Sequence, residues 1–172
     1  PLYQHLMCLP QAEIDRLLLP VIDRLAGQVS SMDSPDYWFS LSATSRGADR
    51  GLFGFYLLNL VCLRPGEAIF QPARLPHAYL HGRNIELMAN SDNVLRGGLT
   101  DKHIAITELL NIVDCGAVQP NILQPADSMA GLQAYPRCGG DYFALDQLFL
   151  SDGDSISLQT MGPEVLLLVD GS

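Results

Sequence analysis

Apolar residues recur every three or four positions in the first part of the chain, a spacing typical of amphipathic helices. The clearest run is Ile14, Leu17, Leu18, Val21, Ile22 and Leu25. Pro10 and Glu13 suit the first turn of this helix, whereas Pro20 predicts a kink or a split. A second helix is expected to start at Ser34-Pro35-Asp36. The pattern therefore predicts a helical domain over residues 1–60.

From Leu57 onward the apolar residues come in short runs separated by turn residues, which is typical of strands. Strands are expected over residues 58–63, 68–71, 77–80, 84–88, 94–96, 142–150, 155–159 and 165–169. Residues 102–113 return to a helical period, and residues 114–137 are expected to form a connector. Closely spaced short strands indicate a sandwich or jelly roll. The predicted fold is mainly β with a helical N-terminal part.

Composition narrows the class of protein. The chain has 172 residues, of which 48% are hydrophobic and 17% charged, as expected for a folded globular protein. A net charge of −9, with Lys102 as the single lysine, argues against a nucleic-acid surface. No apolar run approaches the roughly 20 residues of a membrane helix, and no signal-peptide pattern is seen. We expect a cytoplasmic protein that binds neither membranes nor nucleic acids.

The cysteines and the chain ends add two expectations. The four cysteines, Cys8, Cys62, Cys115 and Cys138, contain no C-x-x-C pair and are expected to be buried, reduced thiols. A zinc–thiolate site or a disulfide framework is the alternative. The chain starts without Met and stops at Asp170-Gly171-Ser172, where a further strand is expected. We therefore expect a fragment of a longer protein.

The densest polar chemistry lies in residues 65–102, which read PGEAIFQPARLPHAYLHGRNIELMANSDNVLRGGLTDK. His77 falls on an expected strand, where an inward imidazole is a good zinc ligand; the alternative is a hydrogen-bonded core histidine. Glu86 follows nine residues later, and strands joined around Gly82 would bring both side chains to one barrel mouth. A carboxylate there suits proton transfer next to a carbonyl, and the alternative is a structural ion pair.

A second polar group lies in the sequence SDNVLRGGL, which contains Asp92, Asn93 and Arg96. The planar guanidinium of arginine matches a phosphate or a developing negative oxygen. Two adjoining glycines would let a backbone approach closely. The alternative for an isolated arginine is a surface charge.

These motifs closely resemble the active-site signature of type I phosphomannose isomerases, zinc-dependent cupin enzymes that interconvert mannose 6-phosphate and fructose 6-phosphate. His77 matches the metal-binding histidine of the family's PHAYL motif, and Arg96 matches its active-site arginine. Lys102 matches the lysine of the family's GLTPK motif, but this chain reads GLTDK. Because Asp101 replaces the usual proline, we expect a looser turn and pairing of its carboxylate with Lys102.

The resemblance implies a mechanism through a cis-enediol, with zinc polarising the sugar oxygens. Glu86 or Lys102 would move protons and Arg96 would steady charge. The substrate, a small sugar phosphate, would also contact Tyr79, Asp92 and Asn93, which complete the set of implied site residues.

The family also uses an upstream Gln-x-His pair and a Glu as metal ligands, and these motifs are missing from this chain. One histidine cannot form a zinc site that needs three or four protein ligands, so we expect this chain to be inactive unless missing segments complete it.

The resemblance implies three parts in the chain. Residues 1–60 correspond to a helical domain, and residues 61–125 to the second half of the catalytic cupin with a helix and a connector. Residues 126–172 correspond to the start of a C-terminal cupin-like domain. The alternative function is a non-catalytic sugar-phosphate-binding or structural cupin that lacks a complete metal site.

Overall fold

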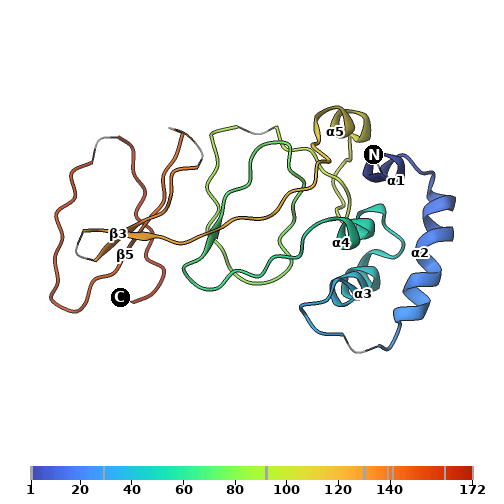
Figure 1. Cartoon of the computed structure of the whole chain (residues 1–172), viewed down its shortest axis with the longest axis horizontal. Helices are drawn as coiled ribbons and strands as arrows, with labels where there is room; N and C mark the ends of the chain where they lie inside the picture. The colour runs from blue at the N-terminus through green and yellow to red at the C-terminus, as the bar shows by residue number, and fades with distance from the viewer. Residues whose placement is uncertain are drawn as a thin grey trace.

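The structure is a computed structural model that describes residues 2–28, 30–91, 93–129, 131–138, 140, 142–160 and 162–171. The helices gather at one end of the molecule and a small sheet lies at the other, with extended segments between them (Figure 1). The helical elements are α1 (Leu2–Met7), α2 (Gln11–Leu25), α3 (Pro35–Arg46), the 3-10 helix η1 (Arg50–Phe53), α4 (Gly54–Leu57) and α5 (Ile106–Ile112).

Helix α2 shows how the predicted helical pattern is realised. Pro10 is its extended N-cap residue, and Gly27 follows its end with a φ of +74°, as expected for a glycine stop. The predicted split at Pro20 is wrong, because the helix runs unbroken to Leu25. Ile14 and Leu25, on either side of the proline, are buried in the same core, and this packing holds the two halves together.

The core of the described residues is helical. Its buried side chains are Ile14, Leu18, Leu25, Phe39, Ala43 and Leu52. Ser34 caps α3 by accepting a hydrogen bond of 3.2 Å from the amide of Asp36, as the Ser-Pro-Asp sequence predicts. Leu99, more than forty residues beyond η1, packs against the same core. A residue of the motif segment therefore contacts the helical core.

Two small antiparallel sheets make up the β structure of the described residues. Strand β1 (Ala68–Ile69) pairs with β2 (Ile122–Leu123), with Ala68 opposite Leu123. Strands β3 (Ala126–Met129), β4 (Leu132–Ala134) and β5 (Asp146–Leu148) form a second sheet in the order β3-β4-β5. The predicted connector over residues 114–137 thus contains three strands, because turn-rich sequence also forms short hairpins.

The expectation of a mainly β chain is wrong for the described residues, of which 29% are helical and 9% are in strands. Only two of the predicted strands, over residues 68–71 and 142–150, contain an assigned strand. The others are extended but have no ladder partner among the described residues. Residues 165–169, for example, have side chains that are 63–95% exposed. A strand needs a neighbour for its backbone hydrogen bonds, and apolar spacing alone does not supply one.

Two further expectations concern the cysteines and membranes. All four cysteines are free thiols, but the expectation that they are buried is wrong, since each is exposed. They lie outside the helical core, where no second layer covers them. Among the described helices, none combines the length and the apolar character that a membrane crossing requires.

Candidate functional site

The structure brings together three of the predicted site residues on the extended segments before and after Gly82. The His77 and Tyr79 rings meet edge to face, with centroids 5.9 Å apart. The hydroxyl of Tyr79 donates a hydrogen bond of 2.8 Å to Oε1 of Glu86. Gly82 has a φ of +110°, a conformation that favours glycine and lets the chain reverse between the two segments. We call these three residues the His77 cluster.

Hydrogen bonding defines the chemistry of His77. Its Nδ1 lies 3.0 Å from the carbonyl oxygen of Leu75. Because a carbonyl oxygen can only accept, Nδ1 must carry the proton in this contact, so the lone pair of the neutral ring is on Nε2. Metal-binding histidines commonly use one nitrogen for a backbone carbonyl and the other for the metal. The ring is exposed, so the alternative of a core histidine is not observed.

Tyr79 holds the Glu86 carboxylate. Partial burial, the hydrogen bond to Glu86 and the negative charge of that carboxylate, in this order, raise the pKa of Tyr79 to about 12. The phenol therefore stays protonated at neutral pH and remains a donor to Glu86. The structural ion pair considered for Glu86 is not found among the described residues. Its hydrogen-bond partner is a phenol, which orients the carboxylate and leaves its second oxygen open.

The described residues do not form a complete zinc site. No group of three His, Cys, Asp or Glu side chains in the described part of the chain is arranged to hold a metal ion. His77 offers one suitable nitrogen, but structural and catalytic zinc sites use at least three protein ligands. Zinc binding by this chain alone is therefore not supported by its geometry.

Arg96 and Lys102 lie at the two ends of a short loop, residues 96–102, that packs on the helical part. The Arg96 side chain is half-buried, and no acceptor for its guanidinium is found among the described residues. Between them, Gly98 adopts a φ of +143°, and a Cβ built there would lie 2.6 Å from the Cα of Gly51. The glycines thus allow the loop to approach the backbone of η1.

The expected pairing of Asp101 with Lys102 is wrong. Asp101 instead forms an ion pair with Arg46, in the last turn of α3. The docked loop presents Asp101 to α3, and the Lys102 ammonium is left exposed. Within this turn the backbone amide of Lys102 donates a 3.2 Å hydrogen bond to Oγ1 of Thr100.

The remaining predicted residues are less informative. Asn93 is exposed, and Asp92 lies outside the described residues. No hydrogen bond or ion pair joins the His77 cluster to the 96–102 loop within the described part of the chain. Sequence reasoning missed Asp49, which contacts the loop through Leu99. The sequence around Asp49 shows only the Asp-x-Gly pattern of a short helix cap, and this pattern does not indicate that Leu99 is a hydrogen-bond partner.

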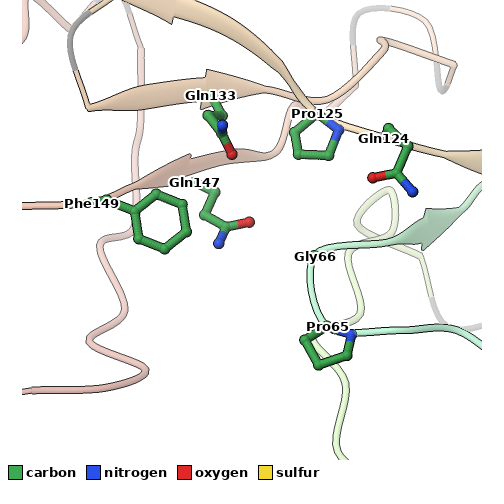
Figure 2. Close-up of a pocket in the computed structure, with 7 residues that line it drawn as sticks. All are labelled: Pro65, Gly66, Gln124, Pro125, Gln133, Gln147 and Phe149. Atoms are coloured by element: carbon green, nitrogen blue, oxygen red, sulfur yellow. The ribbon is translucent and has the colours of Figure 1, made fainter.

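A groove of about 430 Å³ lies away from these residues, between the turn before β1 and the β3–β5 sheet (Figure 2). Its lining residues are Pro65, Gly66, Gln124, Pro125, Gln133, Gln147 and Phe149. The hydroxyl of Tyr135 lies 2.9 Å from the Gly66 carbonyl oxygen and 3.0 Å from Oε1 of Gln147, and ties the two sides together. Neutral amides line this groove, so it lacks the cationic groups that recognise a phosphate.

Known proteins with similar sequences are isomerases. Mannose-6-phosphate isomerase of Escherichia coli is 43% identical over 123 residues, which cover 72% of this chain and 31% of that protein. Mannose-6-phosphate isomerase of Rattus norvegicus is 39% identical over 117 residues, which cover 65% of this chain and 27% of that protein. No family model matches the chain.

A solved structure shows the same likeness in three dimensions. The crystal structure of a point mutant of phosphomannose isomerase from Salmonella typhimurium aligns with a TM-score of 0.70 and 36% identity, covering 84% of this chain and 37% of that one. The chain thus spans about a third of the length of these relatives. Over the matched region it is a homologue of the sugar-phosphate isomerases. These similarities to phosphomannose isomerases confirm the resemblance seen in the motifs.

Proposed function

We propose that the intact protein is a mannose-6-phosphate isomerase, which interconverts mannose 6-phosphate and fructose 6-phosphate. The observation that carries this proposal is the 43% identity to the Escherichia coli enzyme over 123 residues. The motifs around His77, Arg96 and Lys102 add support, because they supply the residue types that this reaction needs. A cytoplasmic location remains a prediction.

The reaction moves a proton between two neighbouring sugar carbons through a cis-enediol, so it needs a base and a group that stabilises negative oxygen. Glu86 is a candidate base, since Tyr79 orients its carboxylate and one oxygen remains open. Lys102 is the second candidate for proton transfer, as an acid or, once deprotonated, as a base, because Asp101 pairs with Arg46 and leaves the lysine side chain exposed. The roles of Tyr79, Asp92 and Asn93 in binding the substrate stay predictions.

Arg96 is the proposed partner for negative charge on the substrate. Its guanidinium is half-buried and has no competing carboxylate within the described residues, so it can bind a phosphate or an enediolate oxygen. Zinc, when bound, would polarise the sugar oxygens, and Nε2 of His77 is the nitrogen that would hold it. The other ligands would have to come from segments outside the described residues.

The cupin-like jelly roll is part of the same proposal. Both sheets of the described residues are antiparallel, as jelly-roll sheets are. The proposed three-part division at residues 60 and 125 rests on the resemblance alone.

The test compares arginine variants of the intact protein. Arg96→Ala is expected to lower kcat/KM for mannose 6-phosphate by about 100-fold, the usual loss when a charge-stabilising donor is removed, with unchanged zinc content. Arg137→Ala is the matched control, because Arg137 is exposed and lies outside residues 65–102. His77→Ala is expected to lower zinc occupancy, measured by elemental analysis. Full turnover in Arg96→Ala would refute the role of Arg96.

The alternative is a non-catalytic sugar-phosphate-binding protein. It is favoured by one observation, the lack of a three-ligand metal group in the described part of the chain. Two measurements on the intact protein, of mannose 6-phosphate binding and of its conversion, distinguish the two functions. Binding of mannose 6-phosphate without conversion to fructose 6-phosphate would establish the alternative, whereas conversion with stoichiometric zinc would exclude it.

A further inference from the structure

We propose that Asp49 is a positioning residue for the catalytic site, which holds the loop between Arg96 and Lys102 in its working conformation. The inference rests on the proposed isomerase function, because it assigns that loop to the active site. Asp49 lies outside the motifs that indicate the site, about fifty residues before the loop. Its role follows from contacts that only the folded chain shows.

One carboxylate oxygen of Asp49 binds two separate parts of the backbone. Oδ1 accepts a hydrogen bond of 2.7 Å from the amide of Gly51 and one of 3.0 Å from the amide of Leu99. The first bond caps η1, so the carboxylate is fixed relative to that helix. Since Leu52 of η1 is fully buried in the core, the oxygen offered to Leu99 has a rigid support.

The loop is shaped to reach this carboxylate. A Cβ at Gly98 would lie 2.6 Å from the Cα of Gly51, and a Cβ at Gly51 would lie 2.9 Å from the amide nitrogen of Leu99. The two backbones are therefore in direct contact where Asp49 bridges them. Leu99 itself has a φ of +52°, uncommon for a residue with a side chain, and packs against the helical core. Such a conformation persists only where its surroundings hold it.

Arg96 lies three residues before Leu99, and Lys102 lies three residues after it. The bond from Asp49 to Leu99 therefore anchors the middle of a loop that carries a proposed charge-stabilising group at one end and a proposed proton-transfer group at the other. Losing the anchor would let both groups move by the small distances to which catalysis is sensitive. The functional effect should exceed the effect on folding.

The experiment compares two substitutions of Asp49 in the intact protein. Asp49→Ala removes the acceptor and is expected to lower kcat for mannose 6-phosphate roughly 10- to 100-fold, as small misplacements of catalytic groups do. Asp49→Asn keeps an oxygen that accepts both amide protons, so kcat should stay within about threefold of the unsubstituted protein. Ser34→Ala is the control, because it removes the cap of α3, a comparable loss, without touching the loop.

Hydrogen exchange provides a readout that does not depend on activity. In Asp49→Ala the amides of residues 97–102 should lose protection, while those of α2 keep it. The proposal is overturned if Asp49→Ala retains full kcat, if Asp49→Asn fails to rescue, or if the losses in Asp49→Ala and Ser34→Ala follow thermal stability alike. If the unsubstituted protein does not isomerise mannose 6-phosphate, the proposed function fails, and exchange of residues 97–102 still decides whether Asp49 anchors the loop.

Discussion

Alanine at Gly98 is the sharpest perturbation of the contact between the 96–102 loop and the helical core. The added Cβ would lie 2.6 Å from the Cα of Gly51, 2.7 Å from its nitrogen and 2.9 Å from Oδ1 of Asp49. Two of these three atoms belong to the backbone, so no side-chain rotation relieves the overlap. The φ of +143° at this position also lies outside the range that residues with a side chain readily adopt.

The size of the effect can be bounded from both sides. Overpacking of this kind costs about 1–3 kcal/mol, and a strained backbone conformation costs about 1–3 kcal/mol more. The loop can avoid the overlap and the strained conformation by detaching from the helical core. Detachment would lose the Asp49–Leu99 hydrogen bond, worth about 1.5–3 kcal/mol for a charged acceptor. It would also lose the burial of Leu99, worth about 1–2 kcal/mol. Because the loop takes the less costly of the two routes, Gly98→Ala should lower the free energy of unfolding by about 2–5 kcal/mol.

Urea unfolding followed by Trp38 fluorescence measures this loss. Trp38 is the single tryptophan, its side chain is buried, and its indole donates a hydrogen bond to the Met32 carbonyl, so its emission reports on the helical core. Gly27→Ala is the matched control: its φ is +74°, but nothing lies within 4 Å of the added Cβ, so only a backbone cost of about 1–2 kcal/mol is expected. If the two variants lose equal stability, the close contact at Gly98 is not what the structure indicates.

Three further predictions concern other parts of the chain. Glu86→Ala should lower the pKa of Tyr79 from about 12 towards 10, measured by NMR titration, because it removes the hydrogen-bond acceptor and its charge. An unfolded tyrosine titrates near pH 10. The stability that the raised pKa of Tyr79 contributes is therefore complete below pH 10 and is lost as the pH rises through 12. Phe39→Ala should reduce the free energy of unfolding by about 3–5 kcal/mol in the same urea assay, because its fully buried ring fills the helical core; a loss under 1 kcal/mol would contradict that core. All four cysteines should react with a thiol reagent in the native protein, and slow reaction of any of them without denaturant would show that it is covered.

The helices were largely predictable because their signals are local. The apolar face of α2, its proline start and its glycine stop all lie within about twenty residues of sequence. The Ser-Pro-Asp cap of α3 is local as well. The predicted split at Pro20 is wrong because tertiary packing holds both halves of α2 on one core, which no window of sequence reveals.

The strands were poorly predictable because a strand is defined by its neighbour. β1 pairs with β2 across more than fifty residues, and the spacing of apolar residues carries no information about that partner. The same alternation in residues 77–80 and 84–88 produced an extended pair joined through Tyr79 and Glu86 without an assigned ladder. The sequence pattern therefore indicated that side chains from these two segments lie close together, but it did not predict the backbone pairing.

The candidate site residues that lie in sequence motifs could be proposed from the sequence, whereas the residues that hold them in place through tertiary contacts could not. The sequence pointed to the His77 cluster and to Arg96 and Lys102. It missed Arg46 and Asp49, because their partners Asp101 and Leu99 lie about fifty residues away. It also assigned Asp101 to its neighbour Lys102, whereas the folded loop turns that carboxylate towards α3.

These contacts change how the helical part is understood. A separate domain over residues 1–60 would be joined to the motif segment by the chain alone, but here Leu99 packs in its core, and Asp49 binds the backbone of the 96–102 loop. Helix α1 adds a further link, since the side-chain amide nitrogen Nε2 of Gln4 donates a hydrogen bond of 3.4 Å to the carbonyl oxygen of Leu110 in α5. Helices that precede and follow the motif segment in the sequence lie together at the end of the molecule where the 96–102 loop packs (Figure 1). The helical core and the loop with Arg96 and Lys102 should consequently unfold together, so a core substitution far from every motif also disturbs the proposed site.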